Sequence, residues 1–259
     1  MDKEVSVVIP TLNEEKVIGG CLKHLINQKD KPLEIIIVDN GSTDSTMEVV
    51  RRLKPKFIRK KITIKLFYYP RGNQTNARDF GVRKALGEMI GFLDADAFPD
   101  KYWISNIKKN LKDERVIGIA GKSFFRNKGW FFNFFYHFVN YYFRILNRFF
   151  LLGGGNCAFK KSAFLSVGGY NGLTKLRKEK KLIYAEDDFF LSKKLEQTGK
   201  LKFCSDLNVT LLHRIRNNQT QKSQEIHSFI NTIKKCFYII ADQYLVLKYF
   251  KEKEKYKNL

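Results

Sequence analysis

Two aspartates, Asp94 and Asp96, follow directly after an apolar run, Met89 to Leu93, that has the composition of a buried strand. Pro99 prevents this strand from continuing as a central strand and favours a turn into a helix. In open α/β folds the carboxyl edge of a parallel sheet is where ligands bind. Carboxylates at such an edge suit Mg²⁺ or Mn²⁺ carrying substrate phosphates. Asp-x-Asp also occurs in ordinary polar loops, so the metal interpretation depends on the rest of the chain.

Three earlier apolar runs also end in polar clusters. Strands predicted at 5–9, 33–38 and 62–68 alternate with segments of helical periodicity, so we expect a mostly parallel central sheet flanked by helices. In that topology the carboxyl ends of the strands converge on one rim. The clusters expected there are Thr11 to Glu14, Asp39 to Asp44, Arg71 to Arg78, and Asp94 to Asp96. No G-x-G-x-x-G follows the first strand, which disfavours a nicotinamide site.

Beyond a fifth predicted strand at 116–120 the alternation ends. Residues 130–150 are densely aromatic, with polar residues spaced by three or four, which indicates a helix with one narrow polar stripe. Two further strands are expected at 201–204 and 209–212. An amphipathic C-terminal helix is predicted over about 225–250.

The composition is strongly basic. The 259 residues include 48 Lys and Arg against 26 Asp and Glu, a formal charge of +22, which implies an anionic partner such as nucleotide phosphates, a lipid surface or nucleic acid. The four cysteines are widely spaced, so we expect reduced, mostly buried thiols and a cytoplasmic protein. We find no signal-peptide pattern, and nothing reaches about 18 uncharged apolar residues, so no membrane span is expected.

The chain resembles the family 2 glycosyltransferases, which are inverting enzymes of the GT-A fold that use nucleotide sugars. The resemblance covers residues 4 to 213, in the family's order, and leaves the C-terminal helix outside. The matching motifs are Val8 to Glu15, Val38 to Asp44, Ala77-Arg78, Phe92 to Asp96, Gly154 to Asn156, Gly168 to Tyr170, and Glu186 to Asp188.

The resemblance implies roles on the donor side. Pro10, Thr11 and Glu14 would line the nucleotide pocket. Asp39 would hydrogen-bond the base, and Asp94 would lie near the ribose. The residues that the resemblance assigns to the diphosphate and its Mn²⁺ or Mg²⁺ are Asp96 and His213 as metal ligands and Arg78 as a fixed cation.

On the acceptor side the resemblance implies Gly155, Asn156 and Glu186 as binding residues. Inversion needs a base for the acceptor's proton and no protein nucleophile.

Two aspartates compete for the role of base. Counting back from Gly199, the expected C-cap of their helix, favours Asp188, whereas matching Glu-Asp by identity favours Asp187. Phe189 or Phe190 stands where many relatives have a second acid, a departure from the family pattern. An acidic first turn is also favoured by the helix dipole alone.

These observations together predict a metal-dependent, inverting glycosyltransferase. It would move one sugar from a nucleotide sugar to a glycan or lipid-linked acceptor, and the absence of Q-x-x-R-W after His213 indicates a non-processive enzyme. The expected parts are a nucleotide-sugar-binding α/β half (1–120), an acceptor-binding half with the aromatic and acidic helices (121–220), and a C-terminal helix with a basic tail (221–259).

The basic charge and the aromatic segment predict peripheral binding to an anionic membrane surface, at its cytoplasmic face. Packing on the sheet, or an oligomer contact, is the alternative role for the aromatic helix. The alternative functions are a nucleic-acid-binding protein and an inactive membrane-surface scaffold. Nucleic acid is disfavoured because the basic clusters lie on helix-to-strand connections, away from the carboxylate rim.

Overall fold

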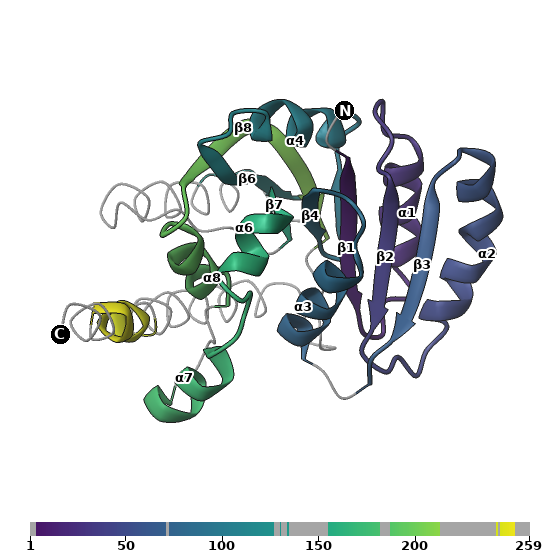
Figure 1. Ribbon diagram of the computed structural model, residues 1–259. Helices are drawn as coiled ribbons and strands as arrows, with labels where there is room; N and C mark the ends of the chain where they lie inside the picture. The colour runs from purple at the N-terminus through teal and green to yellow at the C-terminus, as the bar shows by residue number, and fades with distance from the viewer. Residues whose placement is uncertain are drawn as a thin grey trace.

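The computed structural model describes residues 4–70, 73–126, 130, 134, 155–181, 187–212, 242 and 244–251, and eight strands within these ranges form one sheet (Figure 1). The strand order is β3-β2-β1-β4-β7-β6-β8-β5. The strands are β1 Val5–Thr11, β2 Glu34–Asp39, β3 Thr63–Tyr68, β4 Met89–Leu93, β5 Ala97–Pro99, β6 Val116–Phe125, β7 Asn156–Lys160 and β8 Lys200–Leu211. The helices in these ranges are α1 Ile18–Ile26, α2 Thr46–Arg59, α3 Gln74–Lys84, α4 Trp103–Leu111, α6 Lys161–Ser166, α7 Leu173–Lys180 and α8 Asp187–Leu195.

The sheet has a parallel half and a mixed half. Strands β3, β2, β1 and β4 run parallel, whereas β7 is antiparallel to both of its neighbours, β4 and β6. Strand β8 pairs parallel with β6 and antiparallel with β5. The predicted α/β architecture, a central sheet flanked by helices, is therefore confirmed. The expected boundary after residue 120 falls within β6, so the first two expected parts share one sheet.

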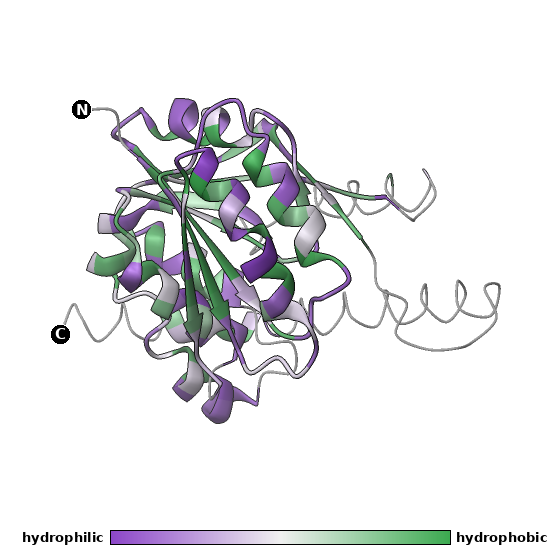
Figure 2. Ribbon diagram, turned by 90° about the vertical axis from the view of Figure 1, so that its right-hand side faces the viewer, coloured by the Kyte–Doolittle hydropathy of each residue, from purple (hydrophilic) through white to green (hydrophobic). Residues whose placement is uncertain are grey.

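Apolar cores lie on both faces of the sheet. Neighbouring strand residues point to opposite faces, so Val7 belongs to the core that includes residues of α1, α2 and α4, while Val8 belongs to the core that includes residues of α3, α6 and α8. Figure 2 shows the consequence, with hydrophobic strands inside the fold and hydrophilic residues on the outward faces of the helices. This two-sided burial is why β1, β2 and β4 are almost entirely apolar, whereas the edge strand β3 has exposed residues at both ends.

Four predicted boundaries were wrong. The fifth predicted strand, expected at 116–120, continues to Phe125 as β6. Strand β1 continues through Pro10 to Thr11, because its ladder with β4 ends at Val8 and Pro10 pairs only with Val38 of β2. The two strands expected at 201–204 and 209–212 form one strand, β8, with a register shift against β6. Helix α8 ends at Leu195, so Gly199 lies beyond it and is not its C-cap.

The described residues contain no helix that is long and apolar enough to cross a membrane. Of the aromatic segment 130–150, the structure describes Trp130 and Phe134, whose side chains are exposed. Of the predicted C-terminal helix it describes Asp242 and the helical residues 244–251. Cys21, Cys157 and Cys204 are free and buried, as predicted.

A buried carboxylate, Glu34 on β2, fixes the turn that leads into β4. Its Oε1 accepts hydrogen bonds from the Ser6 hydroxyl (2.8 Å) and the Leu86 N–H (2.6 Å), and its Oε2 lies 2.6 Å from the Lys65 ammonium. The Ser6 hydroxyl accepts in turn from the Gly87 N–H at 2.8 Å. Burial alone would raise the pKa of Glu34, but Lys65, Leu86 and Ser6 together lower it below its ordinary value of 4.5.

We expect Glu34→Gln to lower the free energy of unfolding at pH 7 by about 2 kcal/mol, because Lys65 loses its anion and the turn loses charge-assisted hydrogen bonds. A carboxyl whose pKa is lowered in the folded state stabilises the fold when the pH is above its ordinary pKa. That stabilisation is lost as the pH falls through the folded-state pKa. The gap between variant and wild type, measured by urea unfolding, should therefore narrow below about pH 4. Glu48→Gln, in an exposed pair with Arg52, is the control and should cost about 0.5 kcal/mol. A gap for Glu34→Gln that is independent of pH would contradict this account.

Candidate active site

The loop after β1 is hydrogen-bonded to the loop after β2. Asn13 Oδ1 accepts from the Thr43 N–H at 2.8 Å, and the Thr46 hydroxyl accepts from the Glu14 N–H at 2.6 Å. Asn13 has φ 56°, a left-handed conformation that asparagine tolerates better than most residues. The two polar clusters predicted to meet at one rim therefore do meet, and they form a single bonded edge.

Asp39 stabilises this edge from the buried side through hydrogen bonds of its carboxylate. The side chain is buried, as are Pro10 and Thr11 at the end of β1. One carboxylate oxygen accepts from the hydroxyls of Thr11 (3.2 Å) and Ser42 (2.5 Å). The other accepts from the N–H groups of Ser42 (3.1 Å) and Gly41 (3.3 Å), where Gly41 takes φ 95° to close the turn. A nucleobase contact from Asp39 would replace one of these bonds, and that role stays a prediction.

Asp94 and Asp96 lie in the tight turn between β4 and β5, and both are partly exposed. The Ala97 N–H bonds to the Asp94 carbonyl at 3.1 Å, which closes the turn and keeps the two carboxylates close. Burial, and then the charge of Asp94, raise the pKa of the Asp96 carboxyl to about 6. Beneath the turn, burial and the same two charges raise the pKa of the Cys21 thiol, which donates to the Asp94 carbonyl at 3.7 Å.

The chemistry of the Asp94–Asp96 turn fits a divalent cation. Two hard oxygen donors stand together, and the charge of one raises the pKa of the other, a repulsion that a cation would relieve. Within the described ranges, however, no group of three or more His, Cys, Asp and Glu side chains is arranged to hold a metal. His213, the further ligand that the sequence predicts, lies outside those ranges and stays a prediction.

Arg78 of α3 is buried between two acidic pairs. Its Nη2 donates to Asp94 Oδ1 at 2.9 Å, and its Nη1 lies 3.4 Å from Asp187 Oδ2 and 3.5 Å from Asp188 Oδ1. The guanidinium carbon stands 5.5 Å from the centroid of the Phe92 ring. Burial alone would lower the pKa of Arg78, but the charges of Asp94, Asp188 and Asp187 raise it above its ordinary value. The structure places Arg78 as a permanently charged link between carboxylates. Its role as a cation for the substrate diphosphate stays a prediction.

The first turn of α8 carries the two candidate bases. Asp187 Oδ2 also accepts from the Thr75 hydroxyl at 3.0 Å. The Asp187 side chain is 22% exposed and the Asp188 side chain 30% exposed. Phe189 and Phe190, the residues that depart from the family pattern, are buried on the α8 side of the sheet. They fix α8 against the core, so that its first two residues face Arg78.

The two acceptor residues predicted at the start of β7 differ in their surroundings. A Cβ on Gly155 would stand 2.6 Å from Asp94 Oδ2, so a larger residue there would displace that carboxylate. Asn156 is buried and serves the fold: Oδ1 accepts from the Trp103 indole at 2.8 Å, and Nδ2 donates to the carbonyls of Lys122 (2.8 Å) and Leu207 (3.0 Å). The Asn156 amide is thus engaged inside the protein. Glu186 lies outside the described residues, and the acceptor roles stay predictions.

Three polar residues that the sequence did not single out join this site. Gln74 donates to Asp94 Oδ1 at 3.1 Å, and Thr75 donates to Asp187. Arg177 of α7 donates to the Thr75 hydroxyl at 3.4 Å, which brings a second guanidinium near the acidic pair. The available signal was the spacing of Gln74, Thr75 and Arg78 on one helix, which places them on adjoining faces.

Comparison with known proteins identifies the family. Residues 6–168 match the pattern of glycosyl transferase family 2. The chain is 33% identical over 127 residues to a dolichyl N-acetyl-alpha-D-glucosaminyl phosphate 3-beta-D-2,3-diacetamido-2,3-dideoxy-beta-D-glucuronosyltransferase of Methanococcus voltae, covering 45% of this chain and 38% of that protein. It is 37% identical over 95 residues to the GalNAc(5)-diNAcBac-PP-undecaprenol beta-1,3-glucosyltransferase of Campylobacter jejuni, covering 36% of this chain and 29% of that protein. The matches thus span less than half the length of these relatives.

The fold has a counterpart among solved structures. The mannosyltransferase PcManGT of Pyrobaculum calidifontis, solved with GDP-Man and Mn²⁺, superposes with a TM-score of 0.64 at 24% identity, covering 84% of this chain and 59% of that one. At that identity the similarity is evidence for the fold alone. The predicted GT-A fold is confirmed. Given the motif order, the matched 6–168 segment and this architecture, the chain belongs to glycosyl transferase family 2.

Proposed function

We propose that this protein is an inverting, metal-dependent, non-processive glycosyltransferase. It transfers one sugar from a nucleotide-sugar donor to a glycan or lipid-linked acceptor, and it works at the cytoplasmic face of a membrane. The observation that carries this proposal is the position of Arg78, whose guanidinium lies within 3.5 Å of carboxylates from both acidic pairs. The donor and acceptor groups would thus be held at one fixed separation.

On the donor side, the bonded edge of the β1 and β2 loops supports the nucleotide, with Pro10, Thr11, Glu14 and Asp39 as the expected contacts. Asp94 lies near the ribose, and Asp96, with His213, would hold Mn²⁺ or Mg²⁺. When bound, that cation neutralises the charge that builds on the departing diphosphate. The solved PcManGT complex with GDP-Man and Mn²⁺ supports this donor chemistry.

On the acceptor side, one proton must be removed. The acceptor oxygen forms a bond to the anomeric carbon from the face opposite the diphosphate, whose bond to that carbon breaks. The acceptor's hydroxyl proton passes to a carboxylate of α8. We assign the base to Asp188, because its side chain is the more exposed of the pair.

Two relatives support a lipid-linked acceptor. The Methanococcus protein is named for a dolichyl N-acetyl-alpha-D-glucosaminyl phosphate acceptor, and the Campylobacter protein for a GalNAc(5)-diNAcBac-PP-undecaprenol acceptor. Such acceptors stay at the membrane, so an enzyme that uses them gains from binding there. The net charge of +22 supports attraction to an anionic leaflet.

A direct experiment is a screen of nucleotide sugars for binding and for hydrolysis with Mn²⁺ or Mg²⁺, followed by transfer to polyprenol-linked acceptors. Retention of the donor's anomeric configuration in the product would exclude an inverting reaction. Turnover of no nucleotide sugar would refute the proposed activity.

Removal of Arg78 should destabilise the fold. Arg78→Met leaves Asp94, Asp187 and Asp188 without their shared cation, and we expect the free energy of unfolding to fall by about 3 kcal/mol. Arg83→Met removes the exposed partner of Asp79 on the same helix and should cost less than about 1 kcal/mol. Adding Asp94→Asn to Arg78→Met should restore part of the loss in urea unfolding. Equal losses for the two arginine variants would contradict the linking role of Arg78.

Asp96→Asn should abolish transfer while leaving the fold intact. Without metal, the variant should be more stable than wild type by about 1 kcal/mol, because one of two adjacent like charges is gone. Mn²⁺ should raise the melting temperature of the wild type and of Asp30→Asn, an exposed control, and leave that of Asp96→Asn unchanged. Full wild-type activity in excess chelator would rule out a metal-dependent reaction.

Asp188→Asn should reduce turnover by about 10²–10⁴-fold with little change in donor affinity, since the lost interaction acts on the proton in transit. Asp187→Asn should be milder in turnover. Donor affinity is read by calorimetry and turnover by product formation at saturating donor. The reverse ranking would assign the base to Asp187.

A further inference from the structure

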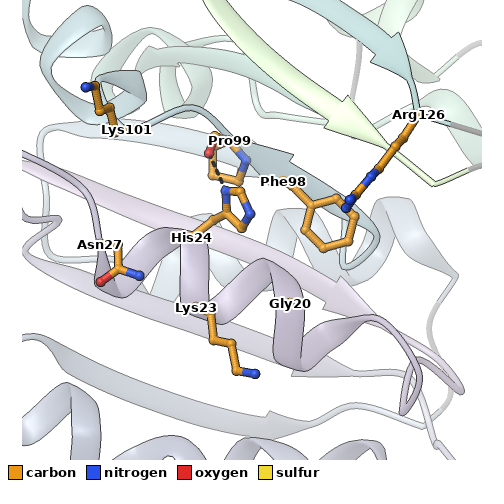
Figure 3. Close-up of a pocket in the computed structure, with 8 residues that line it drawn as sticks. All are labelled: Gly20, Lys23, His24, Asn27, Phe98, Pro99, Lys101 and Arg126. Carbon is orange, nitrogen blue, oxygen red and sulfur yellow. Dashed lines mark hydrogen bonds between the residues drawn. The ribbon is translucent and has the colours of Figure 1, made fainter.

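A basic groove lies on the α1 side of the sheet. It has a volume of about 490 Å³ and is lined by Gly20, Lys23, His24, Asn27, Phe98, Pro99, Lys101 and Arg126 (Figure 3). Phe98 packs on α1, since a Cβ on Gly20 would stand 2.6 Å from its ring. The groove therefore opens in the helix layer opposite α3 and α8, which carry Arg78 and the candidate bases. None of the residues that line it belongs to the candidate active site.

We propose that this groove docks the anionic headgroups of membrane phospholipids. The inference rests on the membrane-surface part of the proposed function and names the face that meets the lipid. Its occupant is the phosphate of an anionic lipid together with the apolar region just below that phosphate.

Charge is the first argument. Lys23 of α1, Lys101 before α4 and Arg126 after β6 border the groove, and no acidic residue lines it. Within the part of the chain that the structure describes, none of these three side chains forms a salt bridge. Figure 3 shows the three cations spaced around the rim, and they do not converge on one point. That arrangement suits a layer of phosphates better than a single buried anion.

Aromatic rings on the same face are the second argument. Phe124 of β6 and Phe98 of β5 both pair with Thr210 of β8, so their side chains lie on the same face of the sheet. Phe124 remains 39% exposed. In Figure 3 the rings of Phe98 and His24 lie between the cations, and His24 Nδ1 is 2.9 Å from the Pro99 carbonyl oxygen. Aromatic rings beside cations are typical of protein surfaces that bind at the boundary between lipid headgroups and acyl chains.

The course of the chain is the third argument. Arg126, at the rim of the groove, is followed in sequence by the aromatic segment that begins at Trp130. The two described side chains of that segment, Trp130 and Phe134, are 79% and 61% exposed. The cationic groove and the start of the aromatic segment are thus only four residues apart in the chain. A lipid surface is the partner that uses both features.

The test is flotation of the full chain with vesicles of phosphatidylcholine that contain about 30 mol% phosphatidylglycerol, so that the vesicle surface carries an anionic potential. The groove variant is Lys23→Gln/Lys101→Gln/Arg126→Gln. The matched control, Lys112→Gln/Lys178→Gln/Lys200→Gln, removes the same charge from exposed positions outside the groove. We expect vesicle partitioning of the groove variant to fall roughly 100-fold, because each cation near an anionic leaflet contributes about a fivefold factor. The control should stay within about threefold of wild type.

Further measurements distinguish the possible causes of a negative result. Conservative exchange of the two lysines, Lys23→Arg/Lys101→Arg, keeps all three positive charges of the groove and should retain binding. Equal partitioning of the groove variant and the control would overturn the inference and leave the proposed function standing. Absence of wild-type binding to any vesicle would overturn the inference together with the membrane-surface part of the proposed function. Loss of vesicle binding when inorganic phosphate is added at constant ionic strength would show a site for free phosphate and overturn the lipid assignment. Transfer to an acceptor in detergent micelles should be unchanged in the groove variant, because the three residues lie outside the active site.

Discussion

A single buried guanidinium, that of Arg78, is the interaction on which the candidate active site depends. A cation removed from water requires anions close by, and Arg78 finds them in Asp94 after β4 and in Asp187 and Asp188 at the start of α8. In the chain, Asp94 is separated from Asp187 and Asp188 by more than ninety positions. A buried ion network of this kind adds little net stability over an apolar core, but it allows only one arrangement of its members. Arg78 therefore fixes where α8 stands relative to the β4–β5 turn.

The sheet fixes the positions of the other elements of the candidate active site. Its parallel half brings the loops after β1 and β2 and the turn after β4 to the same edge. Strand β7, antiparallel to β4, begins beside Asp94, where Gly155 leaves room for the carboxylate. Asn156 then ties β7 to Trp103 of α4 and to the carbonyls of Lys122 and Leu207. The mixed half of the sheet thereby holds the start of β7 in a fixed position beside the Asp94–Asp96 turn.

Much of this was predictable from the sequence where local rules decide. Strand β4 has the predicted bounds, and the polar clusters after the early strands meet as the topology requires. Features set by tertiary contact were not predictable. Nothing local shows that Arg78 is buried, that Asn156 bonds inside the core, or that β1 continues through Pro10 once its ladder with β4 has ended. The end of α8 at Leu195 also removes the sequence argument that counted from Gly199.

The bonded edge formed by the β1 and β2 loops has a consequence for the pace of the reaction. Its polar atoms already satisfy one another, since Asp39 accepts four hydrogen bonds and Asn13 and Thr46 join the loops. A nucleotide that binds at this edge, as proposed, would exchange some of these bonds and would gain little from each exchange. The edge would re-form its own bonds when the spent nucleotide diphosphate leaves. Such an edge would favour rapid departure of the spent nucleotide over tight retention of the donor.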